Sequence, residues 1–231
     1  MTGIDFSYRK GRPVFTGLEW QVPGARTILL GPNGAGKSTL MQLLAGVLKP
    51  SAGTMSGASG RRVGYMPQVI KAIRGMSVLD QVAYCGWLRG LGVARARQEA
   101  LAALDSVRLT SRSNDATTSL SGGQLRRMGL AQAMTGDSEL LLLDEPTAGL
   151  DPAQRDNFAE IVAELTVPVV VATHQIEDLR RTYQDVVVLI EGRIAFQGPV
   201  AEFLTYDAVA GDDPQRAYRG LVADRVGVLE S

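Results

Sequence analysis

Residues 31–39 read Gly-Pro-Asn-Gly-Ala-Gly-Lys-Ser-Thr and match G-x-x-x-x-G-K-[ST], the pattern of a phosphate-binding P-loop. An apolar run of strand length, 27–30, precedes the stretch, and residues 38–46 follow it with the periodicity of a helix. The glycines allow the backbone to form a concave nest of N–H groups, to which the helix N-terminus adds its positive dipole. Without these flanks the residues would indicate only a glycine-rich turn. In this context they predict a nucleotide phosphate site.

Two side chains of this loop carry its chemistry. Lys37 can reach the β- and γ-phosphates of a nucleotide, and the Ser38 hydroxyl can coordinate Mg²⁺. The residues expected to bind nucleotide here are Gly31, Asn33, Gly34, Ala35, Gly36, Lys37, Ser38 and Thr39.

The composition is that of an ordinary globular protein. Of the 231 residues, 45% are hydrophobic and 21% are charged, with 24 basic and 24 acidic side chains. This balance gives no basic footprint for nucleic acid. Cys85 is the only cysteine, which excludes an internal disulfide and suits a reducing compartment. The sequence shows no signal segment or membrane span, so a soluble chain is expected.

Strands alternate with helices along the chain. Strands are expected at 3–8, 14–22, 27–30, 62–66, 139–143, 167–173, 186–190 and 193–196, helices at 38–46, 78–91, 95–107, 120–134, 152–165 and 176–183, and a turn at 49–53. This alternation predicts an α/β fold with a mostly parallel sheet covered on both faces. An antiparallel β part is expected at the N-terminus, and the nearly all-helical block predicts an inserted helical subdomain.

One domain, 1–231, is expected. Its β core would comprise about 1–70 and 138–205, its helical subdomain about 71–137, and a C-terminal extension 206–231. The extension follows no recognisable motif, so a short helix and a loosely held tail both remain open.

Two acids follow the most apolar strand. Asp144 comes after four leucines, at the mouth of a buried strand, where a P-loop protein places its Mg²⁺-associated carboxylate. Glu145 is expected to project the other way and is the candidate for activating or orienting the attacking water. Alone, the pair would indicate two solvated acids at a strand end. Together with the P-loop, it favours a catalytic interpretation.

Two further polar residues also stand at strand ends. His174 is the only histidine, and Gln68 follows a short strand. Ligands in open α/β sheets bind at the carboxyl ends of the strands. His174 could therefore hydrogen-bond a γ-phosphate, and Gln68 could contact the metal or the water. Position alone would favour a structural histidine and a loop glutamine.

The chain resembles the ATP-binding cassette family, the ATPase subunits of ABC transporters, over about residues 4–204. Besides the P-loop, or Walker A motif, the matching segments are 65–68 (the Q-loop), 120–124 (Leu-Ser-Gly-Gly-Gln, the family signature), 140–145 (Walker B with its catalytic glutamate), 148–151 (the D-loop) and 173–174 (the switch histidine). Walker A alone would indicate only a P-loop NTPase; the signature is far more specific. The resemblance implies a RecA-like core. It also implies catalytic roles for Glu145, His174 and Gln68, and a Mg²⁺ site at Ser38, Gln68 and Asp144.

Further nucleotide contacts are implied by the same resemblance. They involve Ser121, Gly122, Gly123 and Gln124 of the signature, and the ring of Tyr8, which lies 23 residues before Gly31, where the family's adenine-stacking aromatic lies. Tyr8 could otherwise be a core or edge-strand residue. Ser121 is a good N-cap before a helix, and the two glycines allow a ligand to approach. In the family this loop closes on the ATP of a second subunit, which implies a head-to-tail dimer around two ATP molecules.

The function implied is that of an ATP-hydrolysing transporter subunit. Such a chain would lie at the cytoplasmic face of the membrane, bound to a separate transmembrane permease subunit, and would use ATP and Mg²⁺. A soluble ABC-type ATPase acting on the ribosome or DNA is the alternative, disfavoured by the single cassette and the compact stretch between Lys37 and Ser121. A regulator without turnover is disfavoured by Glu145 and His174. Segments 68–92 and 173–178 resemble bacterial exporter-type cassettes, so export is expected, while the cargo cannot be read from this chain.

Two other features bear on the structure. The chain begins only a few residues before Phe6, so the first strand is expected to be short and its pairing is open. Residues 69–76 place apolar side chains in a loop beside Gln68, which indicates either a docking surface for the membrane partner or a cap on the core of the helical block.

Overall fold

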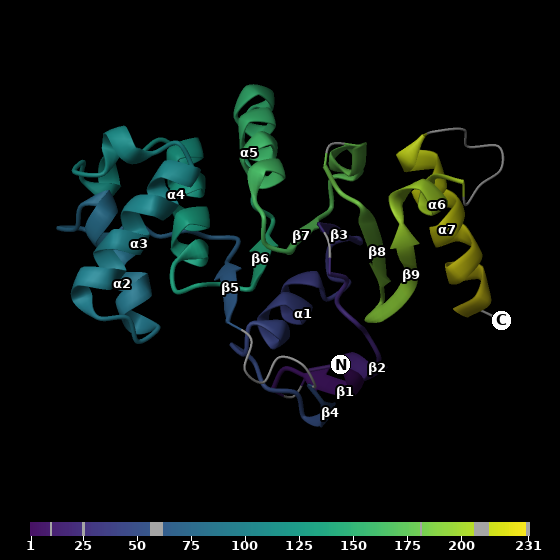
Figure 1. The fold of residues 1–231 in the computed structure, drawn as a ribbon. Helices are drawn as coiled ribbons and strands as arrows, with labels where there is room; N and C mark the ends of the chain where they lie inside the picture. Colours follow the sequence, from purple (N-terminus) through teal and green to yellow (C-terminus); the bar gives the residue numbers. More distant parts are fainter. Residues whose placement is uncertain (10, 25, 56–61, 181, 206–212, 230–231) are drawn as a thin grey trace. The chain divides into compact units, whose positions relative to one another are not determined.

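The computed structural model describes residues 1–9, 11–24, 26–55, 62–180, 182–205 and 213–229 (Figure 1). The chain divides into two compact units. The first comprises 1–59 and 170–231, and the second comprises 60–169. Each unit is described by itself below.

A sheet with a parallel centre forms the middle of the first unit. Its strands are β3 (Thr27–Leu30), β7 (Val169–Thr173), β8 (Asp185–Ile190) and β9 (Arg193–Pro199). β3 pairs in parallel with β7 on one side and with β8 on the other. Every residue of β3 is buried, as expected for a parallel strand covered on both faces. β8 and β9 form an antiparallel hairpin, whose turn residues Glu191 and Gly192 have φ values of 47° and 74°. Positive φ at both positions is typical of a two-residue hairpin turn, as the sequence predicts.

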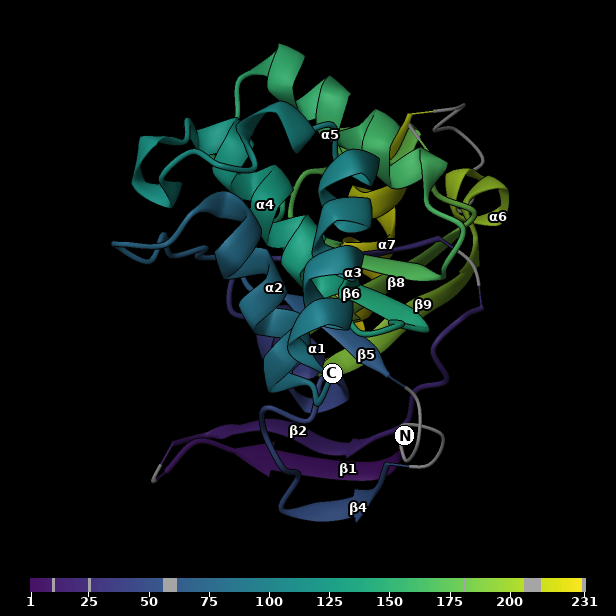
Figure 2. The same cartoon turned by 60° about the vertical axis from the view of Figure 1, so that its left-hand side comes forward.

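A second sheet of the first unit is antiparallel, as predicted for the N-terminus. Figure 2 shows its three strands side by side in the order β2-β1-β4. They are β1 (Thr2–Ser7), β2 (Pro13–Leu18) and β4 (Ala52–Thr54). β1 therefore pairs on both edges, although it begins close to the chain start. The turn predicted at 49–53 is wrong at its end, where β4 begins. Gly53 has φ 91°, and a Cβ there would lie 2.2 Å from the carbonyl oxygen of Gly3, so the absence of a side chain permits this edge strand.

The helices of the first unit are α1 (Lys37–Leu44), η3 (Ile176–Arg180), α6 (Val200–Leu204) and α7 (Pro214–Leu229). The helix predicted at 176–183 is wrong, because only the 3₁₀ helix η3 forms. The N–H groups of Gln184 and Asp185 already donate to the carbonyl of Arg26, so the chain enters β8 too early for a longer helix. The C-terminal extension forms α7, whose Ala217 and Leu221 are fully buried in one core with Leu179 of η3. Residues 206–212 and 230–231 lie outside the described residues.

The second unit combines a parallel strand pair with helices. Its elements are β5 (Val63–Met66), α2 (Val78–Leu88), α3 (Val93–Ser106), η1 (Thr110–Arg112), η2 (Thr117–Ser119), α4 (Gly122–Met134), β6 (Leu140–Asp144) and α5 (Pro152–Glu164). β5 pairs with β6 so that Met66 lies opposite Leu143. The helices α2, α3 and α4 pack against one another, as both ribbon views show (Figures 1 and 2).

Helix α4 is held at its C-terminal end by contacts from two other elements. A Cβ on Gly64 of β5 would lie 2.0 Å from the carbonyl oxygen of Ala133, so a glycine lets strand and helix touch. The Arg89 guanidinium donates to the carbonyl of Ala133 at 3.0 Å, and also to the carbonyl of Thr135 and to the hydroxyl of Ser138. A cation at a helix C-terminus satisfies carbonyls that have no partner within the helix. These contacts hold the end of α4 that lies far from the signature.

Candidate functional site

The P-loop joins β3 to α1, and its glycines are required by close contacts. A Cβ on Gly31 would lie 2.3 Å from the carbonyl oxygen of Leu189. Gly36 is the N-cap of α1 with φ 104°, and a Cβ there would lie 2.9 Å from the Phe15 ring. Gly34 has φ 83°. L-residues rarely adopt such φ values, so the sequence pattern and the loop geometry agree.

Lys37 lies within this loop and is only 7% exposed. Its ammonium donates to the carbonyl oxygens of Gly31 at 2.7 Å and Pro32 at 3.2 Å. The charge is therefore held at the loop that the sequence assigns to phosphate. A phosphate oxygen accepts stronger, charge-assisted hydrogen bonds than a carbonyl does.

We expect Lys37→Ala to weaken ATP binding by about tenfold to a hundredfold, since a hydrogen bond to a charged group contributes about 1.5–3 kcal/mol. Isothermal titration calorimetry of the purified variant with ATP measures this. Lys49→Ala, which removes an exposed lysine after α1, is the matched control. Equal affinity of Lys37→Ala and the wild type would refute the P-loop assignment.

Tyr8 lies beside the first turn of α1. Its hydroxyl is 3.1 Å from the hydroxyl of Thr39, and its ring meets the Phe6 ring edge-on, with centroids 5.1 Å apart. Half of Tyr8 is exposed. The residue is therefore not a core tyrosine, and an aromatic surface is available next to the P-loop helix for a base to stack on.

His174 comes directly after β7. Leu30 of β3 pairs with Thr173 of β7, so the P-loop and His174 leave the sheet at the carboxyl ends of neighbouring parallel strands. The Thr173 hydroxyl accepts a hydrogen bond from the backbone N–H of Gln175 at 3.0 Å, which shapes the turn. His174 is exposed. The first unit thus holds Tyr8 beside the P-loop helix, and His174 directly after the strand that pairs with the P-loop strand.

The two acids of the second unit lie at the carboxyl end of β6, and both are buried. Asp144 is 2% exposed, and its Oδ2 accepts a hydrogen bond from the Tyr65 hydroxyl at 3.3 Å. Glu145 is 6% exposed and has φ 47°. Left-handed backbone at a non-glycine residue costs about 1–3 kcal/mol and is concentrated at functional sites. The sequence predicts the direction of the Glu145 side chain from the alternation of side chains along a strand. That alternation ends at Asp144, because β6 ends there and the backbone of Glu145 turns.

The signature loop caps α4. The Ser121 hydroxyl accepts from the N–H of Gln124 at 3.3 Å, and the Gln124 side chain accepts from the N–H of Ser121 at 2.9 Å. This is the reciprocal capping box, so the N-cap expected at Ser121 is present. A Cβ on Gly122 would meet no atom within 4 Å, whereas one on Gly123 would lie 2.2 Å from Oε1 of Gln154. Gly122, the first residue of α4, is therefore open to a ligand.

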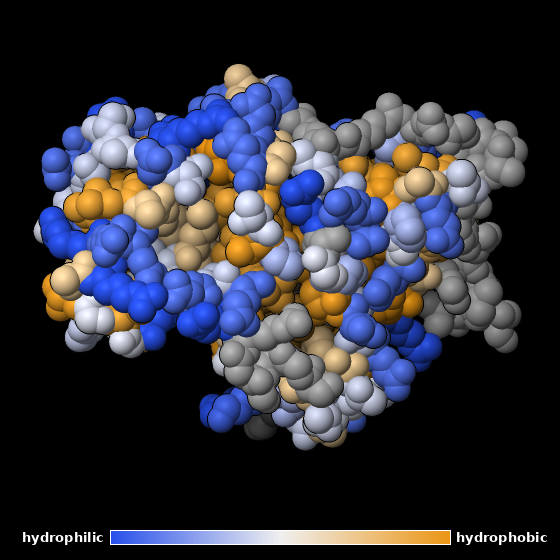
Figure 3. Space-filling model, in the orientation of Figure 1, coloured by the Kyte–Doolittle hydropathy of each residue, from blue (hydrophilic) through white to orange (hydrophobic). Residues whose placement is uncertain are grey.

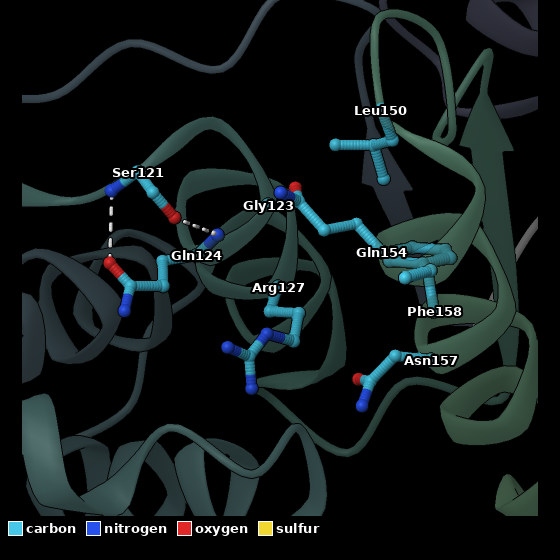
Figure 4. A pocket seen from close by; sticks show the side chains of 9 residues that line it. Ser121, Gly123, Gln124, Arg127, Leu150, Gln154, Asn157 and Phe158 are labelled. Atoms are coloured by element: carbon cyan, nitrogen blue, oxygen red, sulfur yellow. Dashed lines mark hydrogen bonds between the residues drawn. The ribbon is translucent and has the colours of Figure 1, made fainter.

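A pocket of about 280 Å³ lies between the N-terminal part of α4 and the start of α5 (Figure 4). It is lined by Ser121, Gly123, Gln124, Arg127, Leu150, Ala153, Gln154, Asn157 and Phe158. Asp151 caps α5 by accepting from the N–H of Gln154 at 2.8 Å and from its side-chain amide at 2.7 Å. Asp151 of the D-loop therefore holds the side chain of Gln154 in place over Gly123.

The sequence patterns do not mark Gln154 or Arg126 as neighbours of the site, and they include Tyr65 only as part of the Q-loop segment, without its contact to Asp144. Arg126 donates to the carbonyl oxygens of Gln68 and, at 3.1 Å, of Ala148. Nothing in the sequence distinguishes it from Arg127, whose guanidinium instead donates to the carbonyls of Val107 and Arg108. The site residues thus fall into two groups. The first unit holds Tyr8, the P-loop and His174, and the second holds Gln68, the signature, Asp144 and Glu145.

Comparison with known proteins identifies the family. Residues 16–148 match the family model described as ABC transporter. The chain belongs to the ABC transporter family. It carries the ATP-binding cassette of this family, as the motifs predict.

Two curated relatives illustrate the range of the ABC family. The chain is 34% identical over 236 residues to the nickel import ATP-binding protein NikO of Rhodobacter capsulatus, covering 90% of this chain and 92% of NikO. It is 33% identical over 201 residues to the Nod factor export ATP-binding protein I of Paraburkholderia xenovorans, covering 81% and 66%. Other curated relatives are longer, and the chain spans 61%, 70% and 65% of three of them.

Solved structures confirm the α/β cassette fold. CbiO1 from Clostridium perfringens, part of the ABC transporter complex cbiONQ, is 27% identical with a TM-score of 0.74, and the match covers 90% of each chain. Among the helices of the described residues, none has the length and hydrophobicity of a membrane span.

Proposed function

We propose that this chain hydrolyses ATP in a dimer of cassettes and thereby drives a separate transmembrane subunit. The proposal rests chiefly on the P-loop, whose backbone carbonyls hold the buried Lys37 ammonium. The signature helix of the same chain is capped and leaves Gly122 open. In it, Lys37 holds the β- and γ-phosphates of ATP, and Tyr8 stacks on the adenine. The chain itself would lie at the cytoplasmic face of the membrane through its partner.

Magnesium is the metal that suits the proposed site. Its candidate ligands are the Ser38 hydroxyl, the side-chain oxygen of Gln68 and the buried Asp144 carboxylate. All are hard oxygen donors, and Mg²⁺ typically takes one or two carboxylates together with substrate phosphates. The Tyr65 hydroxyl, which donates to Asp144 at 3.3 Å, would orient this carboxylate as an outer-shell partner. When bound, the ion would neutralise charge on the phosphates.

Three residues have proposed roles in hydrolysis. Glu145 accepts a proton from the attacking water or orients that water. His174 hydrogen-bonds the γ-phosphate, and Gln68 contacts the metal or the water. The backbone of Glu145 is held in a left-handed conformation, which aims its side chain independently of the strand alternation. Purified chain should release phosphate from ATP only when Mg²⁺ is present, and chain without such activity would refute this role.

The signature loop acts in trans in this proposal. Gly122 and the N-terminus of α4 would contact the γ-phosphate of an ATP held by the P-loop of a second subunit, so that two ATP molecules lie in a head-to-tail dimer. Backbone N–H groups at a helix N-terminus and the helix dipole both favour an anion. The dimer would close on ATP binding and open after hydrolysis.

The membrane partner is proposed to dock on residues 69–76 and helix α2. Val69 is 66% exposed and Ile73 is 40% exposed, whereas Ile70 lies against α4. The backbone of this segment is held in place, since Gln81 accepts from the N–H of Ile73 at 2.8 Å and donates to the carbonyl of Lys71 at 2.8 Å. The exposed apolar side chains of this fixed loop support docking. The position of Ile70 against α4 instead fits the alternative, in which the segment caps the core of the helical block.

Helix α2 extends the same apolar surface. Tyr84, Trp87 and Leu88 are 38%, 50% and 61% exposed, and the two rings stack with centroids 5.7 Å apart. In Figure 3 apolar residues interrupt the polar surface over α2 and α3. Exposed aromatic clusters of this kind mark protein interaction sites.

We expect Ile73→Glu to abolish co-purification with the transmembrane subunit while leaving the ATPase rate of the isolated chain unchanged. A charge at a desolvated apolar contact costs several kcal/mol, on the order of a thousandfold in affinity. Val47→Glu, at a 61% exposed apolar residue of the first unit, is the matched control. Normal co-purification of Ile73→Glu would place the docking site elsewhere, and a collapsed melting temperature would make Ile73 part of the core.

Export is the proposed direction, on the resemblance of 68–92 and 173–178 to exporter-type cassettes. The relatives named above include an import protein and an export protein of similar identity. The test uses inverted membrane vesicles that contain the complete transporter, with this subunit facing the medium. Added ATP should drive cargo into the lumen, and ATP-driven loss of preloaded cargo would show import.

A further inference from the structure

The Arg126 guanidinium joins two loops that follow neighbouring strands. Arg126 lies in the second turn of α4, and its two terminal nitrogens donate to different carbonyl oxygens, those of Gln68 and Ala148. Gln68 follows β5, and Ala148 lies in the turn that follows β6 and Glu145. The planar guanidinium carries several donors in a fixed fork, so it can hold two acceptors in fixed relative positions.

The register of β5 and β6 explains why the two loops that carry these carbonyls begin side by side. Met66 pairs with Leu143, so Gln68 and Glu145 each lie two residues beyond a paired position, at the same edge of the strand pair. Helix α4 lies against this edge. A Cβ on Gly129, one turn after Arg126, would lie 2.6 Å from Cδ1 of Ile70. The arginine thus projects from a helix already held against the loop of Gln68.

The positive charge of Arg126 also interacts with the carboxylate of Glu145. Burial lowers the pKa of its guanidinium, and the carboxylate of Glu145 raises that pKa in opposition. The residue is half-buried, so its hydrogen bonds are partly protected from water. Removing the side chain would leave the carbonyls of Gln68 and Ala148 without this shared donor.

We propose that Arg126 is a positioning residue for ATP hydrolysis, which fixes the backbone of Gln68 at a constant distance from the turn that follows Glu145. The inference rests on the proposed function of Gln68. Because the Gln68 side chain is exposed, its own packing does not fix it, and the hydrogen bond to its carbonyl supplies that constraint.

The first test compares steady-state phosphate release by Arg126→Ala and Arg89→Ala. Both variants remove a guanidinium that donates to backbone carbonyls, one beside Gln68 and one at the far end of α4. For Arg126→Ala we expect kcat to fall by about tenfold or more with an almost unchanged KM, as misplacement of a catalytic group produces. Arg89→Ala should lower the melting temperature and leave kcat unchanged. Equal kcat values for the two variants would overturn the proposal.

The second test asks whether the effect passes through Gln68. In a Gln68→Ala background the Arg126→Ala change should alter kcat by less than about twofold, because residues that act as a unit are non-additive. Fully additive losses would overturn the proposal. Arg126→Lys keeps the charge without the fork, so it should remain impaired. Wild-type kcat in Arg126→Lys would show that charge, rather than the bridge, matters.

A third measurement does not depend on activity. Hydrogen exchange of a peptide covering residues 66–72, without nucleotide, should be faster in Arg126→Ala than in the wild type or Arg89→Ala. Unchanged exchange would overturn the bridge even if hydrolysis occurs. Conversely, faster exchange in a chain whose wild type hydrolyses no ATP would refute the proposed function and leave the bridge standing.

Discussion

Glu145→Gln should bind ATP with wild-type affinity and lose phosphate release by about a hundredfold or more, as expected when a general base is removed. The amide keeps the size and position of the carboxylate but cannot accept the proton of the attacking water. Because the residue is 6% exposed at the end of β6, bulk water has little access with which to substitute for it. A phosphate-release assay measures turnover, and calorimetry measures ATP affinity.

The matched control for this variant is Glu139→Gln. Glu139 is exposed just before β6, at the opposite end of the same strand, where it pairs with Arg62 at 3.5 Å. Exposed ion pairs contribute little to stability, so this variant should hydrolyse ATP normally. Wild-type turnover by Glu145→Gln would remove Glu145 from the mechanism.

Mixing two inactive variants should restore activity. Lys37→Ala disables the P-loop of its own subunit, and Ser121→Arg places a bulky side chain beside the open Gly122, where phosphate would approach in trans. Each variant alone should hydrolyse little ATP. In a mixed dimer, the P-loop of the Ser121→Arg subunit faces the normal signature of the Lys37→Ala subunit, so one of the two sites is intact.

The expected recovery follows from random pairing. With equal amounts of both variants, about half of the dimers contain one chain of each kind. Each of these mixed dimers has one intact site of two, so about a quarter of all sites are intact. Phosphate release should therefore rise to about a quarter of the wild-type rate on mixing. The Ser121→Arg chain should still bind ATP, which calorimetry checks. A mixture no more active than its separate components would contradict a site shared between subunits.

Much of the fold could be predicted because the decisive segments are strongly patterned. Four consecutive leucines at 140–143 indicate a strand buried on both faces, and β6 is fully buried. β4 could not be predicted, because it is short and exposed and forms only where Gly53 approaches Gly3. The length of η3 depends likewise on a distant contact, the pairing of Gln184 with Arg26. Such contacts have no local signature in the sequence.

The candidate site shows the same division. The P-loop could be assigned from sequence because its glycines include local positions of positive φ, 83° at Gly34 and 104° at Gly36. The capping box at Ser121 is likewise local, since both partners lie within four residues. The bridge made by Arg126 could not be predicted, because its acceptors come from two other segments and its neighbour Arg127 is chemically identical. The left-handed backbone of Glu145 also carries no sequence signal.

The central claim, that ATP holds two of these chains together through the P-loop of one and the signature of the other, is tested most directly by the molar mass of Glu145→Gln. Multi-angle light scattering should show a monomer without nucleotide and a doubled mass with ATP and Mg²⁺, because a ligand that binds the dimer more tightly than the monomer shifts the equilibrium towards the dimer. Adding Ser121→Arg to the same chain should return it to a monomer that still binds ATP. A Glu145→Gln chain that stays monomeric in saturating ATP, or a double variant that dimerises as well as the single one, would contradict the account.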